Sequence, residues 1–237
     1  MQNISIKTKL ILNLIFSVSI IIIIGLVTYT NLQKLDTYQN ELNQKYNRAQ
    51  LAIEVSSSGE KLYSIIANSY IYGNLETQKK EFDTEKITTS DNMEILKQGA
   101  SPEQQEKLRF ANSEYLKIVA SYESAILPKL HFLSDNPEDT LASALITQYM
   151  YELKSYMGAF KSSLNLIAHD IVAEAEVEKV KFDETRQSIV TLNMILIIAG
   201  ILLIFISAFS IMRSIIVPLN KAVGFVNNIS KNTAKTT

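Results

Sequence analysis

Two long apolar runs near the ends of the chain constrain its fold more than any other feature. The first covers residues 10–29 and the second covers residues 189–212, and neither contains Asp, Glu, Lys or Arg. Each run can cross a bilayer as a helix, because roughly 20 residues at about 1.5 Å each span a hydrocarbon core of about 30 Å. The sequence therefore predicts two transmembrane helices that flank a polar segment, residues 30–188.

A cleaved signal peptide is the alternative interpretation of the first run, with Lys7 and Lys9 as its basic end. The run is longer than the apolar core of a typical signal peptide, and no A-x-A cleavage site follows it. We therefore prefer an uncleaved transmembrane helix.

Charges beside the two runs predict the orientation. Residues 1–9 and 213–237 together contain five lysines, Arg213 and no acid, which favours the cytoplasmic side for both ends. Removing these six cations from the net charge of −1 leaves −7 for the rest of the chain. The segment outside the membrane is thus acidic, and this charge distribution does not favour nucleic-acid binding. Since the chain has no cysteine, packing and not disulfides must stabilise that segment.

Glycine and proline, only 7 and 4 in the chain, divide residues 30–188 into four predicted helices. The first ends near Gly73, and the second covers about residues 75–97. Ser101, Pro102 and Gln104 form the N-cap, first position and capping box of the third. The fold class is therefore all-α.

Two further signals complete this division. Pro128 is expected to kink or end the third helix. Residues 134–139 supply a cap, a proline and first-turn acids for a fourth helix, which continues into the second apolar run. Four helices with short connections predict an extracytoplasmic antiparallel bundle, with Ser101 and Asn136 at opposite ends.

Apolar side chains at helical spacing predict which faces point inward. On the first helix a polar gap at residues 56–60 interrupts this pattern, and the opposite face is either solvated or a loose homodimer contact. The predicted core residues are Leu35, Tyr38, Leu42, Tyr46, Ala49, Ile53, Tyr63, Ile66, Tyr70, Phe82, Met93, Leu96, Leu108, Ala111, Tyr115, Ile118, Tyr122, Ile126, Leu141, Leu145, Tyr149, Leu153, Phe160, Leu164, Ile167 and Ile171. The opposite face of the first helix comprises Asn40, Gln44, Asn47, Leu51, Glu54, Ser58, Lys61, Ile65, Asn68 and Tyr72.

Residues for catalysis or metal binding are sparse. The two histidines, His131 and His169, are interpreted as surface or packing residues, and we expect no metal or other cofactor. The sequence has no glycine-rich phosphate loop and no nucleophile with a base at a recognisable spacing. We therefore do not expect an enzyme. A run of acids is best explained as a solvated helix face: Glu174, Glu176, Glu178, Asp183 and Glu184.

The residues after the second run carry a short apolar repeat. Ile216, Leu219, Val223 and Val226 have the 3-4-3 spacing of a coiled-coil seam, beside Pro218. This stretch, residues 213–237, resembles the first helix of a HAMP linker. The start of the chain, NISIKTKL at residues 3–10, resembles methyl-accepting chemotaxis proteins with a four-helix-bundle sensor.

The resemblance implies a homodimeric chemoreceptor of the bacterial inner membrane. Its outer domain would detect a small solute or a periplasmic binding protein and signal through the fourth helix and the HAMP residues Pro218, Leu219 and Val223. A HAMP domain needs a second helix, and the family's contacts with the chemotaxis kinase and adaptor need a further cytoplasmic region, both of which are missing before Thr237. We therefore expect the sensing part of a longer receptor or a shortened gene. A sensor for a histidine kinase or cyclase and a ligand-free membrane-anchored scaffold are the alternatives.

In that family, solutes bind between subunits in the membrane-distal half, against the first and fourth helices. Amino-acid-binding members use several arginines there, and this chain has none in that region. One lysine beside tyrosines would suit an aromatic or monoanionic solute better. The candidate ligand-binding residues are Lys61, Ser64, Asn68, Thr147, Gln148 and Tyr149. The tyrosines in the same stretch are Tyr63, Tyr70, Tyr72, Tyr149, Tyr151 and Tyr156.

Overall fold

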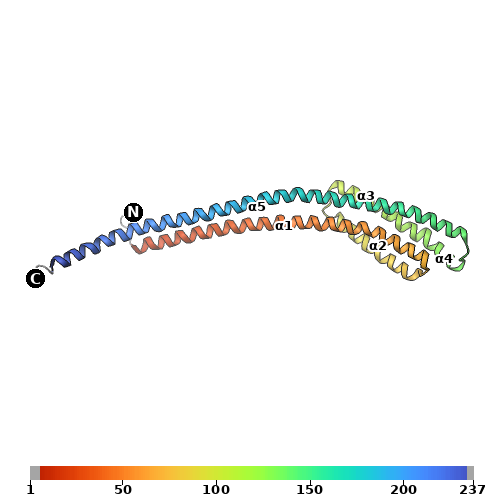
Figure 1. Cartoon of the computed structure of the whole chain (residues 1–237), viewed down its shortest axis with the longest axis horizontal. Coiled ribbons are helices and arrows are strands. Elements are labelled where there is room, and N and C mark those ends of the chain that lie inside the picture. The colour runs from red at the N-terminus through yellow and green to blue at the C-terminus, as the bar shows by residue number, and fades with distance from the viewer. Residues whose placement is uncertain (1–5, 234–237) are drawn as a thin grey trace. The chain divides into compact units, whose positions relative to one another are not determined.

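Every regular element in the computed structural model, which describes residues 6–233, is a helix (Figure 1). The all-α prediction is therefore confirmed for these residues. The two long helices are α1 (Ile6–Tyr72) and α5 (Thr140–Thr233). Between them in the sequence lie α2 (Leu75–Lys97), α3 (Pro102–Ala120), the π-helix η1 (Ser121–Ile126) and α4 (Leu127–Asp135). The start of the N-terminal motif, at Asn3, and the basic residue Lys235 lie outside the described residues.

The helices pack as two units, and α1 and α5 contribute to both. Unit 1 contains these helices up to Gln39 and from Lys181 onward, and unit 2 extends from Asn40 to Val180. Unit 2 thus lies within the predicted outer segment, residues 30–188.

Unit 1 contains both apolar stretches, each with a mean hydropathy of 2.9. By length and composition, both helices can cross a membrane. A Cβ atom placed on Gly200 of α5 would lie 2.5 Å from Cδ1 of Ile24 on α1, so the glycine permits a close approach of the two helices. Two polar contacts also join them within this unit: Ser207 donates to Asn13, and the Asn31 amide donates to Asn193 at 3.4 Å.

The predicted helix ends in unit 2 are confirmed, and local hydrogen bonds explain them. The capping box is formed: the Gln104 backbone N–H donates to Ser101 Oγ at 3.3 Å, and the Ser101 N–H donates to Gln104 Oε1 at 3.2 Å. Gly73 and Gly99 follow α1 and α2 with φ of 69° and 72°, a conformation that favours glycine. Asp139 accepts from a backbone N–H in the first turn of α5 at 2.7 Å.

Pro128 was expected either to kink or to end the third helix, and helical structure does not end there. The wider η1 turn immediately precedes it, and the Leu127 N–H bonds to the carbonyl of Tyr122. A proline ring collides with the carbonyl four residues earlier in a regular α-helix, and a π-turn changes that geometry. Helix α4 then continues to Asp135.

Unit 2 has one hydrophobic core to which all of its helices contribute. The Phe82 and Tyr122 rings pack with centroids 4.2 Å apart, which joins α2 to η1. Tyr115 donates its hydroxyl to the Lys86 carbonyl at 2.6 Å, and burial raises its pKa. The predicted core residues that are buried are Leu42, Ala49, Ile66, Phe82, Met93, Leu96, Leu108, Ala111, Tyr115, Ile118, Tyr122, Ile126, Leu153, Phe160, Leu164, Ile167 and Ile171.

The predicted inward face of α1 is partly wrong. Tyr38, Ile53 and Tyr70 are exposed, whereas the predicted polar gap contains buried residues. A Cβ atom on Gly59 would lie 3.0 Å from the Phe160 ring, so small residues of α1 are needed where α5 presents this ring. The gap residues that are buried are Ser56, Ser58 and Gly59.

The structure also corrects two other predictions about helix faces. The opposite face of α1 is not a continuous surface for a second subunit, since Ser58 is buried and Leu51 and Ile65 pack against the core. On α5, Leu141 is 70% exposed, and Ala142 occupies the buried position next to it. Both errors arise because the predicted helix faces were assigned from the larger apolar residues.

Candidate functional site

The predicted ligand-binding residues of α1 lie on partly or fully exposed positions of unit 2. The Lys61 side chain is 58% exposed, and its Nζ lies 3.8 Å from Oε1 of Glu85 on α2. Ser64 is exposed and Asn68 is half-buried. Lys61 is therefore the accessible cation of this group, with one carboxylate as a neighbour.

The predicted residues of α5 have local partners. The Thr147 hydroxyl donates to the backbone carbonyl one turn earlier at 3.0 Å, and the Gln148 amide donates to Glu152 at 3.2 Å. Nζ of Lys129 lies 5.4 Å from the centroid of the Tyr149 ring, a cation–π arrangement. These side chains would have to exchange such contacts to hold a solute.

Two cross-helix contacts define how α1 and α5 align in unit 2. Lys161 pairs with Glu60 at 2.5 Å, and the hydroxyls of Tyr70 and Ser143 lie 2.7 Å apart. The two helices are therefore antiparallel. Lys61 of α1 lies opposite the part of α5 near Lys161, and this part is about 20 Å along α5 from Thr147, at about 1.5 Å per residue. The structure brings Asn68 to the level of the α5 residues but does not bring Lys61 there.

The tyrosines of this region divide into two groups. Tyr63, Tyr149 and Tyr156 pack against the core of unit 2 and contribute to its stability. Tyr72 and Tyr151 are 74% and 80% exposed. Tyr70 is also exposed, but its hydroxyl bonds to that of Ser143, so Tyr72 and Tyr151 are the tyrosines most available to a solute or a partner.

The HAMP-like residues lie in the last part of α5. Pro218 is inside the helix and does not end it. Leu219 and Val223 are 53% and 57% exposed. Their apolar surface is therefore free to pack against another helix, as a coiled-coil seam requires.

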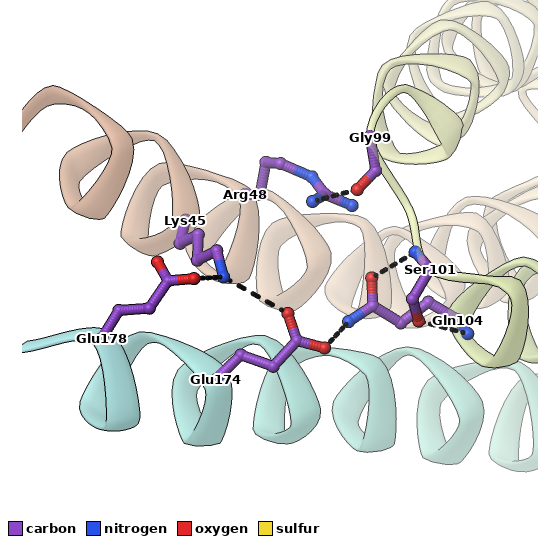
Figure 2. A network of polar contacts seen from close by, with 7 residues as sticks. All are labelled: Lys45, Arg48, Gly99, Ser101, Gln104, Glu174 and Glu178. Carbon is purple, nitrogen blue, oxygen red and sulfur yellow. Dashed lines mark hydrogen bonds and ion pairs between the residues drawn. The ribbon is translucent and has the colours of Figure 1, made fainter. Parts of the chain in front are cut away.

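A polar network that the sequence did not predict surrounds the connection between α2 and α3 (Figure 2). Arg48 of α1 donates through Nη1 to the Gly99 carbonyl at 2.8 Å and through Nη2 to the Leu96 carbonyl at 3.2 Å. Leu96 is in the last turn of α2, where carbonyls have no partner within a regular helix, and Gly99 follows the end of this helix. Arg48 therefore caps α2 from a neighbouring helix.

The same network reaches α5 through two acids (Figure 2). Lys45 lies 2.6 Å from Glu178 and 3.6 Å from Glu174, and the buried Gln104 amide donates to Glu174 at 3.0 Å. Gln104 thus completes the capping box of α3 and also binds α5. Part of the predicted acidic run is exposed to solvent, as expected, and also connects α5 with α1 and α3.

A cavity of about 630 Å³ lies beside this network. Its wall includes Glu41, Lys45, Arg48 and Glu178, so both cations and carboxylates line it. Arg48 Nε is buried and has no hydrogen-bond partner within the described residues. The capping box was recognisable from the sequence, but no spacing signal places Arg48 at the end of α2, because the two segments are distant in the chain.

Replacing Arg48 with alanine should lower the free energy of unfolding of unit 2 by about 1.5–3 kcal/mol, since hydrogen bonds from a charged donor are lost and helix-end carbonyls lose their partner. Arg48→Lys should recover only part of this loss, because lysine lacks the fork that reaches two carbonyls. Guanidinium unfolding of the chain in a mild detergent, followed by circular dichroism, measures the effect.

Arg109→Ala is the matched control, since Arg109 is exposed on α3 of the same unit. Its effect should remain within about 0.5 kcal/mol. Equal losses for the two variants would contradict the capping role of Arg48.

Among residues 6–229, no group of three or more His, Asp or Glu side chains has the arrangement of a metal site. Comparisons of the chain with protein-family models, with curated proteins and with solved structures find no match. The functional interpretation therefore depends on the residues and geometry described above.

Proposed function

We propose that the chain is the sensory and transmembrane portion of a bacterial chemotaxis receptor. One observation carries this proposal: α1 and α5 contain both the apolar stretches of unit 1 and a large share of the core of unit 2. Two helices that cross a membrane would thereby be part of a folded polar unit. A stimulus that alters unit 2 would then act directly on the membrane helices.

The proposed topology follows from the charges. Lys7, Lys9 and Arg213 flank the apolar stretches on one side, which favours the cytoplasm of a cell with an inner membrane. Residues 10–29 and 189–212 would be the two spans, and the acidic segment between them would lie outside. Unit 2 would be the sensor.

The sensor would be an antiparallel four-helix bundle of α1, α2, the α3–η1–α4 segment and α5. The alignment of Glu60 with Lys161 and of Tyr70 with Ser143 supports this arrangement. Arg48 joins α1 to the connection of α2 and α3, and Asn136 precedes α5 near the opposite end.

Signal transmission would use α5, which is a single helix from Thr140 to Thr233. A stiff helix transmits a small axial displacement that a flexible linker would lose. The exposed apolar residues Leu219 and Val223, next to Pro218, would pass it to a HAMP domain in a homodimer. Chemotaxis kinase and adaptor contacts would need a cytoplasmic region beyond this sequence.

For the ligand, we propose a small aromatic or monoanionic solute that contacts Lys61. The full chain in lipid nanodiscs should bind such a solute in isothermal titration calorimetry. Lys61→Ala should weaken binding by about tenfold or more, the equivalent of one hydrogen bond to a charged group. Amino acids should bind weakly, because one lysine lacks the bidentate geometry of arginine.

Lys80→Ala is the control, since Lys80 is an exposed lysine of α2 in the same unit. It should leave the affinity unchanged. Binding that survives Lys61→Ala combined with Thr147→Ala would place the site elsewhere. If no small aromatic acid, amino acid or binding protein raises the stability of unit 2, the scaffold alternative is favoured.

A further inference from the structure

A second cavity, of about 620 Å³, lies between α1 and α5 in unit 1. Its wall changes character along the helices. Lys9 and Ser210 line the part near the start of α1, whereas Leu12, Phe16 and Leu203 line the part deeper in the apolar stretches. The hydrogen bond from Ser207 to Asn13 shows that these segments face each other. The cavity is thus basic at the Lys9 end and mainly apolar towards Phe16 and Leu203, and the polar Asn13 and Ser207 in its wall are hydrogen-bonded to each other.

No Asp or Glu side chain of the same chain lies within reach of Lys9. No Asp or Glu precedes Asp36 or follows Glu184 in the sequence. Asp36 is on the same helix as Lys9, about 40 Å away at about 1.5 Å per residue. The half-buried Lys9 is therefore available to pair with an anion from outside the chain.

The position of the cavity limits what that anion can be. Lys9 directly precedes the first apolar run, at the depth where lysine side chains extend to the lipid headgroups. A free phosphate would satisfy the cation but would leave the apolar part of the cavity empty. A molecule with a phosphate at one end and a hydrocarbon chain at the other matches both parts.

We infer that this cavity binds one anionic phospholipid, with its phosphate against Lys9 and the Ser210 hydroxyl and an acyl chain along Leu12, Phe16 and Leu203. This inference depends on the proposed function only in placing unit 1 in a membrane. Such a lipid would lie between the two membrane helices at the end that leads to the HAMP-like segment. Its binding would therefore favour one relative position of α1 and α5.

Native mass spectrometry of the full chain in a neutral detergent, with phosphatidylglycerol or phosphatidylcholine added, tests this inference. One phosphatidylglycerol should be retained per chain, in preference to phosphatidylcholine. Lys9→Gln should reduce its retention by about fivefold, the usual contribution of one lysine to anionic-lipid binding. Ser210→Leu should also reduce it, because the larger side chain fills the cavity without a change of charge.

Two matched controls separate the cavity from general effects. Lys7→Gln removes the same charge two residues away, outside the cavity wall, and Ser19→Leu makes the same change of size on an exposed position of α1. Both should retain phosphatidylglycerol like the original chain. Equal losses for Lys9→Gln and Lys7→Gln would overturn the inference, as would equal retention of the two lipids.

The second copy of the chain is the competing occupant. If a disulfide between two Ser210→Cys chains forms readily and phosphatidylglycerol does not slow it, a second subunit fills the cavity and the inference is wrong. Cysteine labelling of unit 2 in intact cells reports the topology separately. A failed lipid test with a normal labelling pattern would thus remove the lipid site and leave the proposed function in place.

Discussion

Phe160→Ala should lower the free energy of unfolding of unit 2 by about 3–5 kcal/mol, the usual loss for truncating a buried phenylalanine. Phe160 is 0% exposed, and its ring lies against Gly59 of α1 and 5.9 Å, between centroids, from Tyr115 of α3. Because Gly59 is part of a helix, the backbone of α1 cannot easily collapse into the vacated space. Guanidinium unfolding of the chain in mild detergent, followed by circular dichroism, measures the change.

Phe110→Ala provides the comparison, since Phe110 is 52% exposed on α3. It should change the stability by less than about 0.5 kcal/mol. Similar losses for both variants would mean that Phe160 does not occupy the core between α1 and α5. Comparing the two variants therefore tests the packing of Phe160 against Gly59, which showed that the predicted inward face of α1 is partly wrong.

Helix ends were predictable from the sequence because they depend on local chemistry. Ser101, Pro102 and Gln104 specify the start of α3 within four residues, and Gly99 permits the left-handed backbone after α2. Neither signal requires knowledge of distant residues. The same holds for the apolar runs, since length and composition alone make them candidates for membrane spans.

The inward face of α1 was less predictable, because it depends on what the partner helix presents. Apolar periodicity favoured Ile53, yet Ser56 is buried instead, and Gly59 lies where Phe160 needs space. The η1 turn is a similar case. Pro128 signalled a disturbance of the helix, but the local sequence did not specify whether the helix ends or widens; in the structure it widens in η1, where Tyr122 packs against Phe82 of α2.

The candidate sites also show the difference between features set by local sequence and features set by contacts between distant residues. Lys61 and Thr147 were selected from a resemblance and from their positions in the chain, and the alignment of α1 with α5 separates their levels. Arg48 carries no local signal, and its role depends on the distant carbonyls of Leu96 and Gly99. Contacts between segments that are distant in the sequence therefore determine the geometry of these sites, which residue spacing alone could not predict.

Thiol labelling in intact cells tests the central claim, a sensor outside the membrane with both chain ends inside. The chain has no cysteine, so an introduced one is the only thiol. Asn136 and Asn227 are both exposed, the first in the connection before α5 and the second beyond the second apolar stretch. Asn136→Cys should react with an impermeant maleimide in intact cells, and Asn227→Cys should react only after the membrane is permeabilised. Labelling of Asn227→Cys in intact cells, or protection of Asn136→Cys, would contradict the account.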